Sequence, residues 1–470
     1  MPTSSRERDC VTPSFLSTAH QPVGPESDSA APTGITISVF GCGYLGAVHA
    51  AAMAAVGHHV IGVDVDVEKV ASLAEGRVPF FEPELPELLL EAQATGRLVF
   101  TADPAQARGA TVHFICVGTP QRRGEYAADV SYVEQAFETV LGIAQPGDLI
   151  VGKSTVPVGT AERLADRLAQ ERPDVTLVWN PEFLREGYAV ADTLRPDRLV
   201  YGTAASDRED VVSGLDAVYA QPLSGGTPRI VTDFATAQLV KVAANSFLAT
   251  KISFINAMAE LCEATGADVT QLADAIGHDN RIGRRFLNAG LGFGGGCLPK
   301  DIRAFMARAG ELGVDQALTF LREVDQINMR RRVRMVDLAR EVSGGSIVGR
   351  RIAVLGAAFK PDSDDVRDSP ALNVALQMQL QGADVVVTDP EAVANAERLY
   401  PQLRFAATAE EAATDADLVM LLTEWPEYLE LDPVDLGKVV AGRRILDGRN
   451  ALDPEEWRFA DWTYRALGRP

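Results

Sequence analysis

The stretch Ile35-Thr-Ile-Ser-Val-Phe-Gly41-Cys-Gly43-Tyr-Leu-Gly46 sets the class of fold, because a β-branched run leads directly into three spaced glycines. A short apolar run of this kind predicts a buried strand. The first glycine permits a tight turn, the second lets a ligand approach the backbone, and the third lets a helix and a strand pack closely. We therefore predict a strand, a turn and a helix in that order.

An acid follows this motif at the distance expected of a dinucleotide site. Asp64 closes the next β-branched run, Val60–Val63, roughly 20 residues after the glycines. Its carboxylate can accept hydrogen bonds from ribose hydroxyls, and it would repel a 2′-phosphate, so NAD is favoured over NADP. Lys69 weakens this preference, because a nearby cation could accommodate a phosphate. We predict NAD contacts from Gly41, Gly43, Tyr44, Leu45, Gly46, Asp64 and Lys69.

The alternation of short β-branched runs with longer Ala- and Leu-rich stretches predicts a parallel sheet covered by helices. Residues 234 to 265 contain neither proline nor glycine and have a helical period, which predicts one long helix. After Gly344-Gly345 a second strand–helix–strand pattern begins at Arg351. The predicted fold class is α/β, with two Rossmann-like doubly wound domains joined by a helical middle segment that contains a long central helix.

The domain boundaries follow from the same pattern. Residues 1–34 are rich in Ser, Thr and Pro and predict a mobile tail. An NAD-binding Rossmann domain is predicted at 35–215, a helical central domain at 216–346, and a C-terminal Rossmann-like domain at 347–470. In the last domain, Gly356-Ala-Ala-Phe-Lys360 follows a strand but lacks the glycine fingerprint, and we expect it to serve a different nucleotide.

Composition excludes several classes of function. The chain has 470 residues, 46% of them hydrophobic, and no run approaches the ~18 apolar residues of a membrane span. A formal charge of −21 argues against nucleic acid or an anionic membrane as a partner. Five scattered cysteines without metal-type spacing fit a reducing cytoplasm, and we expect no metal site.

A second glycine run carries a candidate nucleophile. In Phe293-Gly294-Gly-Gly-Cys297-Leu-Pro-Lys300-Asp301 a cysteine follows three glycines, with a cation and a carboxylate within four residues. Lys300 is the local cation that could raise the thiolate fraction of Cys297. A packing role competes with this interpretation, because free cysteines are commonly buried core residues. The other cysteines of the predicted strands and of the long helix fit that packing role.

Two further clusters contain polar groups, one after a predicted strand and one on the long helix. Glu182 and Glu186 lie four residues apart after a predicted strand, where open α/β sheets bind ligands. Lys241 and Asn245 are also four apart and share one face of the long helix. Taken alone, that helix face is better explained by exposure to solvent.

Together these runs resemble the UDP-glucose/GDP-mannose dehydrogenase family. The resemblance covers nearly everything from Ile35 onward and rests on many motifs in the same order. They are Gly41–Gly46, Val117–Pro120, Lys153–Val158, Asn180–Gly187, Leu261–Asp268, Asn280–Gly283, the cysteine run, and Phe359-Lys360.

The resemblance implies an enzyme that oxidises a primary alcohol twice, from the C6 hydroxyl of UDP-glucose to the carboxylate of UDP-glucuronate, with two NAD reduced. Cys297 would form a thiohemiacetal and then a thioester with the substrate. Lys241 and Asp301 would assist proton removal in the first step. Glu182 would be the base for thioester hydrolysis, with Thr155 and Asn245 ordering the water.

The resemblance also implies binding roles and a subunit contact. Residues expected at NAD are Thr119, Ser154, Glu186, Lys300 and Arg367. Residues expected at the nucleotide sugar are Glu182, Phe183, Leu184, Lys241, Asn245, Arg281, Phe286, Gly294, Phe359, Lys360 and Arg449. The family counterpart of Arg281 reaches a neighbouring subunit, so a homodimer or higher homo-oligomer is expected. The alternatives are the same chemistry on GDP-mannose or a UDP-N-acetylhexosamine, and a nucleotide-sugar sensor without turnover.

Overall fold

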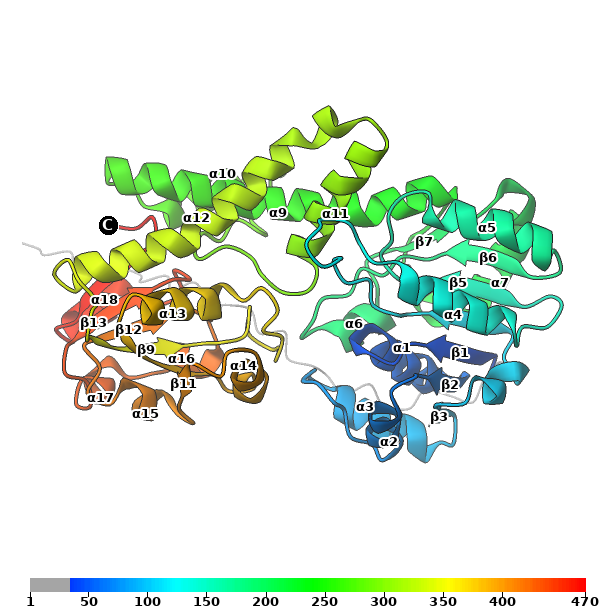
Figure 1. Ribbon diagram of the computed structural model, residues 1–470, viewed down its shortest axis with the longest axis horizontal. Helices are drawn as coiled ribbons and strands as arrows, with labels where there is room; N and C mark the ends of the chain where they lie inside the picture. The colour runs from blue at the N-terminus through cyan, green and yellow to red at the C-terminus, as the bar shows by residue number, and fades with distance from the viewer. Residues whose placement is uncertain (1–33) are drawn as a thin grey trace, which may run out of the picture. The chain divides into compact units, whose positions relative to one another are not determined.

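The computed structural model describes residues 34–470, so the tail predicted at 1–34 lies outside the described residues except for Gly34. Residues Ile35–Pro470 form one compact unit that contains two parallel sheets and a group of long helices (Figure 1). The predicted fold class is confirmed. Within residues 34–470, each helix is too short or too polar to cross a membrane.

The first sheet has the strand order β3-β2-β1-β4-β5-β6-β7-β8, and its first six positions follow the order of a doubly wound nucleotide-binding sheet. Its pairs are parallel except for β6 with β7. The strands are β1 Thr36–Phe40, β2 His59–Val63, β3 Leu98–Thr101, β4 Val112–Ile115, β5 Leu149–Gly152, β6 Thr176–Trp179, β7 Leu199–Gly202 and β8 Arg229–Thr232. The sheet therefore continues beyond residue 215, where the sequence pattern places the end of this domain.

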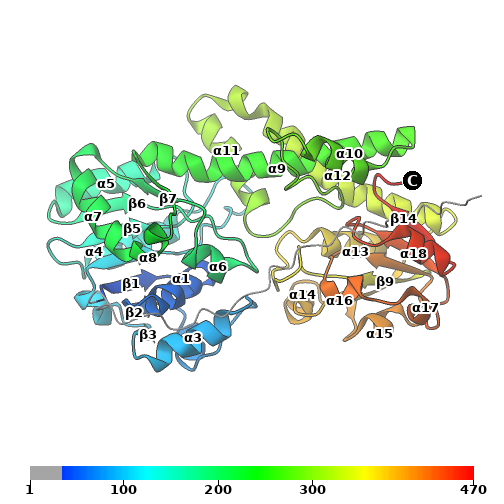
Figure 2. The same ribbon diagram turned by 180° about the vertical axis from the view of Figure 1, so that it is seen from behind.

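Helices cover both faces of this sheet. They are α1 Tyr44–Ala55, α2 Val67–Ala74, α3 Leu85–Ala94, α4 Ser131–Leu141, α5 Thr160–Glu171, α6 Ala189–Leu194, α7 Arg208–Val218 and α8 Ala220–Ser224, with 3₁₀ turns η1 Pro104–Gly109 and η2 Ala205–Asp207. Helices α4 and α5 lie on the face seen in Figure 1, and α1 and α6 lie on the face seen in Figure 2. Both sheet faces are thus buried, as near-continuous apolar strands require.

The middle segment consists of α9 Phe234–Thr265, α10 Val269–Gly277, α11 Leu298–Glu311, η3 Asp315–Leu318 and α12 Thr319–Val342. Helix α9 has the bounds predicted from its period and spans about 48 Å. It begins where the Asp233 carboxylate accepts a hydrogen bond from the Thr236 amide, and it ends at Gly266 in the left-handed conformation. Helices α11 and α12 both pack against α9.

The second sheet repeats the same strand order, β11-β10-β9-β12-β13-β14, and all its pairs are parallel. Its elements are β9 Arg351–Leu355, α13 Pro370–Leu380, β10 Asp384–Thr388, α14 Val393–Leu399, β11 Arg404–Phe405, α15 Ala409–Ala413, β12 Leu418–Leu421, α16 Pro426–Leu429, α17 Pro433–Leu436, β13 Arg444–Asp447, α18 Pro454–Phe459 and β14 Thr463–Ala466.

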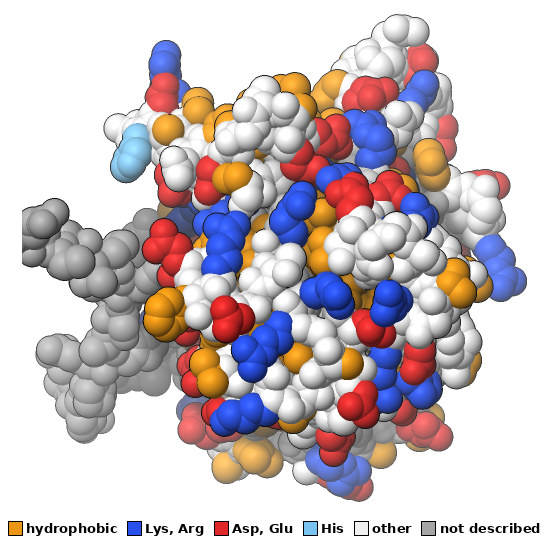
Figure 3. Space-filling view, turned by 90° about the vertical axis from the view of Figure 1, so that its left-hand side faces the viewer, with side chains coloured by type: hydrophobic (Ala, Val, Ile, Leu, Met, Phe, Trp, Pro, Cys, Tyr) orange, Lys and Arg blue, Asp and Glu red, His pale blue; other side chains and the backbone are white. Residues whose placement is uncertain are grey.

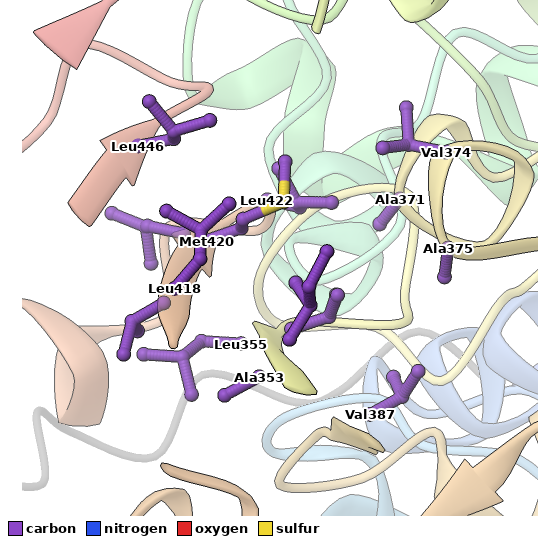
Figure 4. Packing of buried hydrophobic residues seen from close by; sticks show 14 of the residues in the cluster. Ala353, Leu355, Ala371, Val374, Ala375, Val387, Leu418, Met420, Leu422 and Leu446 are labelled. Carbon is purple, nitrogen blue, oxygen red and sulfur yellow. The ribbon is translucent and has the colours of Figure 1, made fainter. Parts of the chain in front are cut away.

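Small side chains let α13 approach this sheet closely. Ala371, Val374 and Ala375 of α13 are fully buried beside the strand residues Leu355 and Met420 (Figure 4). Each buried leucine or methionine contributes about 2 kcal/mol through removal from water. The outer surface near this sheet mixes basic and acidic side chains (Figure 3), so the charge of −21 does not form a uniformly acidic surface.

Candidate active site

The glycine loop, residues 41–46, lies between β1 and the first turn of α1. Gly41 has a φ of 88°, and a Cβ on Gly46 would stand 1.8 Å from the Gly41 carbonyl oxygen. A Cβ on Gly43 would meet nothing within 4 Å, so the loop surface there is open. Helix α1 has no side-chain cap at its N-terminus, which leaves amide groups free for a phosphate.

Asp64 lies beside this loop at the end of β2. Its Oδ2 atom accepts hydrogen bonds from the Cys42 amide at 2.7 Å and from Lys69 Nζ at 3.1 Å. The carboxylate is buried and fixed by these contacts. Lys69, which could have accommodated a 2′-phosphate, is instead paired with the acid, and this pairing supports NAD over NADP.

Thr119 and Ser154 lie at the carboxyl ends of neighbouring strands, where their hydroxyls connect two loops. The Thr119 hydroxyl donates to the Thr155 carbonyl oxygen at 2.7 Å, and the Ser154 hydroxyl donates to the Val117 carbonyl oxygen at 2.7 Å. Both side chains are buried. These hydrogen bonds hold the loops after β4 and β5 together at the edge of the sheet where ligands bind.

One turn of α9 brings four of the predicted catalytic groups together. Lys241 Nζ lies 2.9 Å from Glu182 Oε1, and Asn245 Nδ2 lies 2.6 Å from Asp301 Oδ2. Lys241 and Asn245 are only 5% and 8% exposed, so the solvent-facing interpretation of this helix face is wrong. Burial acts to lower the pKa of Lys241, but Glu182, Cys297 and Asp301 outweigh it and raise the pKa.

Cys297 lies beside this cluster as the residue that precedes α11, and its side chain is exposed. The protein packed around the thiol and the charge of Asp301 raise its pKa to about 12, while Lys241 acts to lower it. Lys300, the cation expected to activate the thiol, instead donates to Asp301 Oδ1 at 2.7 Å and contacts Thr119 Oγ1 at 3.4 Å. The charge of Lys241 acts to lower the pKa of Cys297, and Arg367 is a second cation coupled to this thiol, so activation by Lys300 stays a prediction.

The cysteine loop, residues 293–297, rests on the segment 365–370 that follows β9. The Gly295 amide donates to the Arg367 carbonyl oxygen at 2.9 Å, and the Gly296 amide donates to Asp365 Oδ2 at 3.2 Å. A Cβ on Gly294 would stand 2.5 Å from the Asp368 carbonyl oxygen. Only glycines allow this approach, which brings the thiol to the second sheet.

Glu186 connects a loop of the first sheet with the loop that follows β9 in the second sheet. Its carboxylate contacts the Ser363 hydroxyl at 3.1 Å and Arg367 Nη2 at 3.4 Å, and its backbone carbonyl accepts a hydrogen bond from Lys360. Burial and the charge of Asp365 raise the pKa of Glu186 to about 7, against the opposing effect of Arg367 and Lys360. Burial also lowers the pKa of Lys360.

The predicted nucleotide-sugar residues are only partly brought together. Phe359 lies under the Lys360 ammonium, which is 5.6 Å from the ring centre. Arg449 donates to the carbonyl oxygens of Leu422, Gly292 and Phe359. Phe183 lies between two cations, with Arg198 at 3.7 Å and Lys241 at 5.6 Å from its ring centre.

Two other predicted substrate residues lie apart from this cluster. Arg281 is exposed and pairs with Asp279 at 2.7 Å. Phe286 is 39% exposed and has a φ of 65°, a conformation that costs a bulky residue strain. No interaction within residues 34–470 directs either side chain to Cys297.

Sequence reasoning missed Glu82, a buried carboxylate that fixes the loop after β6. It accepts hydrogen bonds at 2.7 Å from the amides of Gly187 and Ala189. Burial raises its pKa to about 7, although these amides act to lower it. Lys153 belongs to one of the motifs without an expected role, yet it is buried and lines a cavity together with Glu182. The local sequence indicates the role of neither residue, because these roles depend on partners remote in the chain.

Three family models match successive parts of the chain. The NAD binding domain of the UDP-glucose/GDP-mannose dehydrogenase family matches residues 35–222, its central domain matches 235–330, and its UDP binding domain matches 353–454. The first match confirms NAD as the cofactor and the chain as an NAD-dependent dehydrogenase.

Relatives match over almost the whole length. UDP-glucose 6-dehydrogenase of Rhizobium meliloti is 41% identical over 92% of this chain and 99% of its own, and UDP-glucose 6-dehydrogenase TuaD of Bacillus subtilis is 39% identical over 92% and 93%. A solved UDP-glucose dehydrogenase from Pyrobaculum islandicum is 36% identical with a TM-score of 0.84, covering 95% of this chain and 100% of that one. A UDP-D-ManNAc dehydrogenase from Pyrococcus horikoshii is 27% identical with a TM-score of 0.81, covering 93% and 99%.

Proposed function

The chain belongs to the UDP-glucose/GDP-mannose dehydrogenase family, and from that premise we propose that it oxidises UDP-glucose to UDP-glucuronate through a covalent intermediate on Cys297. The observation that carries this proposal is the position of Cys297, an exposed residue, beside the buried pairs Lys241–Glu182 and Asn245–Asp301. An alcohol dehydrogenase that stops at the aldehyde needs no nucleophile of this kind. In a four-electron reaction such a nucleophile can hold the aldehyde for the second hydride transfer.

The glycine loop and Asp64 fit NAD. The open surface at Gly43, the uncapped start of α1 and the fixed carboxylate of Asp64 provide sites for a pyrophosphate and a ribose. NAD, when bound, supplies the hydride acceptor for both oxidations. Thr119, Ser154, Glu186 and Arg367 complete the proposed cofactor site from the neighbouring loops.

In the first oxidation, the substrate's C6 hydroxyl loses a proton as hydride leaves its carbon. Asp301 is the group proposed to take that proton, directly or through water, and the Lys241 ammonium assists by stabilising the developing oxyanion. Because Glu182, Cys297 and Asp301 raise the pKa of Lys241, this ammonium stays charged at neutral pH. The products of the step are an aldehyde and a proton held by the protein.

In the second oxidation, the Cys297 sulfur attacks the aldehyde carbon, and the thiol proton passes by way of the protein to the aldehyde oxygen. The resulting thiohemiacetal carries its oxygen as a hydroxyl, and loss of hydride and a proton from it gives a thioester. With a pKa of about 12, the thiol is protonated at neutral pH before substrate binds. Its activation therefore depends on Lys241 and on a proton acceptor, for which Asp301 is the nearest candidate.

Hydrolysis of the thioester completes the reaction. We assign Glu182 as the base that removes a proton from water, while Asn245 and Thr155 order that water. Asn245 is fixed by Asp301, and Thr155 shares a cavity with Lys300 and Asp301. Water's oxygen forms the new bond to carbon, the carbon–sulfur bond breaks, and the product is a carboxylate.

UDP-glucose is the proposed substrate because the chain is about 40% identical to named UDP-glucose 6-dehydrogenases over most of its length. The positive side chains Lys360 and Arg449 would provide the local charge for a diphosphate in a chain of net charge −21, and Arg281 would join them from a neighbouring subunit. The alternative is another nucleotide sugar, and the match to UDP-D-ManNAc dehydrogenase keeps it open.

We also propose a homodimer with α9 at its interface. Phe247, Phe254 and Leu261 recur every seven residues along α9 and are 65%, 49% and 58% exposed. Such a stripe of large apolar side chains is typical of a helix that packs against another chain. The same interface would carry Arg281 into the partner's site. Sedimentation of a Phe254→Asp variant as a monomer would support this arrangement, and an unchanged dimer would contradict it.

The reaction is tested by its stoichiometry. We expect two NADH per UDP-glucose, and slower turnover with GDP-mannose and UDP-N-acetylglucosamine. One NADH per substrate would indicate an alcohol dehydrogenase, and none would indicate a sensor. A preference for GDP-mannose or UDP-N-acetylglucosamine would refute the assignment of UDP-glucose as the substrate.

Cys297→Ser tests the nucleophile. The variant should lose more than about 1,000-fold in UDP-glucuronate formation and keep its affinity for NAD, because the thiol lies outside the glycine loop. Cys262→Ala is the matched control, since Cys262 is buried in α9 and should be dispensable for turnover. Retained turnover in Cys297→Ser would overturn the assignment.

The thiol's electrostatics provide a separate test. Asp301 raises the pKa of Cys297, so Asp301→Asn should lower it and speed alkylation of Cys297 by iodoacetamide between pH 8 and 10. Peptide mass spectrometry at several pH values would measure the rate at this one cysteine. An alkylation rate that is unchanged or slower would contradict the proposed influence of Asp301.

A further inference from the structure

A cavity lies beside Glu182, and neither Cys297 nor Asp301 is among the residues of its wall. It holds about 560 Å³ of space, part of it open to solvent. Its walls come from α1, from the ends of β5 and β6, and from the loop after α6. The residues that matter to its chemistry are His49, Lys153, Asn180, Glu182, Asp197 and Tyr219.

The deep end of this cavity is polar and connected. Lys153 Nζ lies 3.2 Å from Asn180 Oδ1 and 3.3 Å from the Tyr219 hydroxyl, which itself donates to Asn180 Oδ1 at 2.7 Å. Lys153 is 7% exposed. Burial lowers its pKa, and the charge of Glu182 acts in the opposite direction. Lys153 and Glu182 are therefore electrostatically coupled across the cavity.

His49 adds a polar atom that the protein leaves without a partner. The residue is 1% exposed, and its Nε2 atom has no hydrogen-bond partner within residues 34–470. Burial and Lys153 lower the pKa of His49, so the imidazole is neutral. A buried polar atom that faces a cavity is normally satisfied by water. The cavity is therefore suited to hold water next to Lys153.

The other end of the cavity reaches the surface. Asp197 and Arg198 form part of the wall, and Asp197 is exposed. Asp192 also lines this end, where it is paired with Arg185. The cavity thus has a buried amine at its base and carboxylates at its mouth.

We propose that this cavity is a water-filled proton path through which Glu182 returns to its ionised form after thioester hydrolysis. This inference rests on the proposed function. When water attacks the thioester, its proton goes to Glu182, and the Cys297 sulfur leaves. On the reacting side, Glu182 Oε1 accepts a hydrogen bond from Lys241 at 2.9 Å, and Glu182 Oε2 accepts one from the Leu184 amide at 2.7 Å. The proton leaves through the cavity, by way of water held by Lys153 and Tyr219, to solvent at Asp197.

The path explains two features that the mechanism does not use. Lys153 is buried 3.2 Å from the Asn180 amide oxygen, and within residues 34–470 no carboxylate is in direct contact with it. Burial of such a lysine costs free energy unless the lysine has a role in proton transfer or positioning. The neutral His49 beside it is equally costly as an unpartnered group. Both line a cavity that excludes Cys297, so neither is placed to contact the reacting carbon.

The test compares Tyr219→Phe and Lys153→Met with Tyr201→Phe as control. Tyr201 stacks on Tyr219 at 6.4 Å and is buried, but it does not line the cavity. Each enzyme is mixed with NAD and UDP-glucose in a single turnover, quenched, and weighed by mass spectrometry for the Cys297 thioester. We expect the thioester to persist at least about 10-fold longer in the two cavity variants, and imidazole in the buffer to restore most of the rate.

The outcomes separate this proposal from the one it rests on. A wild-type enzyme that forms no thioester refutes the covalent mechanism. If the wild type forms it and both cavity variants hydrolyse it at the wild-type rate, the proton path is wrong. A raised KM for UDP-glucose with unchanged hydrolysis, or a slow hydrolysis that imidazole does not restore, would also overturn it. Tyr219→Phe decides the matter if Lys153→Met fails to fold.

Discussion

The two sheets share one strand order, yet only the first has a loop built for a dinucleotide. In each, a glycine follows the first strand with a positive φ, 88° at Gly41 and 111° at Gly356. Each glycine amide donates a hydrogen bond at 2.8 Å to the carbonyl oxygen of the last residue of the second strand, and an acid follows that residue. Those acids are Asp64 and Asp389. The backbone geometry of the strand end is therefore common to both halves.

The two halves differ in the residues after this glycine. In the first half, α1 begins at Tyr44 and directs its free amides at the loop, whereas in the second half α13 begins only at Pro370. Asp389 also accepts a hydrogen bond from the Trp425 indole at 3.1 Å. The indole therefore occupies the carboxylate that a ribose would need. One half thus keeps its acid and helix end for a ligand, and the other uses them for packing.

Gly46→Ala should have the largest effect on this comparison. The new Cβ would stand 1.8 Å from the Gly41 carbonyl oxygen, so α1 must move and NAD affinity should fall by about 100-fold or more, roughly 3 kcal/mol. Gly43→Ala is the matched control: it has room in the protein and should leave the unfolding free energy unchanged while weakening NAD by about 10-fold. Calorimetric titration with NAD measures the NAD affinity of both variants. Equal NAD affinities in the two variants would contradict this difference.

Replacing Asp64 and Asp389 with alanine, one at a time, should separate an effect on NAD affinity from an effect on the free energy of unfolding. Asp389 accepts from four backbone amides and an indole, so Asp389→Ala should cost about 3 kcal/mol of unfolding free energy and leave NAD affinity unchanged. Asp64→Ala should instead weaken NAD by about 10-fold. Urea unfolding and NAD titration of both variants test the contrast. If Asp389→Ala weakens NAD as much as Asp64→Ala does, the two halves are not functionally distinct.

Cys42→Ala should have a smaller effect. The equivalent position in the second half is Ala357, whose amide also donates to the acid at 2.7 Å, so the backbone contact does not need the thiol. Removing the buried sulfur should cost about 1 kcal/mol and change NAD affinity less than about twofold. A large loss of NAD affinity would assign Cys42 a direct role in binding.

Ala358→Gly should have the smallest effect. It gives the second loop a glycine where the first has Gly43, but the loop still lacks a helix start and a free acid. We expect one NAD per chain, as before, and a loss of about 0.5 kcal/mol from the added backbone freedom. A second NAD in an equilibrium titration would show that the glycine alone had been missing.

Local sequence predicted the elements well where one pattern dominated. The bounds of α9 were predicted because its period was uninterrupted from Asp233 to Gly266, and both ends carry capping residues. The end of the first sheet was not, because the addition of β7 and β8 to the sheet is set by pairing with partners remote in the chain. Within the candidate site, Cys297, Lys241 and Asp301 were identified from motifs, whereas Glu82 and the setting of Lys153 were not.

The sequence by itself determined the glycine loop, the acid that follows it, the long helix and the position of the candidate nucleophile, because each depends on neighbours in the chain. Only the tertiary structure decided which cation acts on the thiol. Lys300 is three residues from Cys297 but is paired with Asp301, whereas the charge of Lys241, which belongs to α9, acts to lower the pKa of the thiol. Electrostatic interactions depend on distance in space and on burial, and neither can be read from separation along the chain.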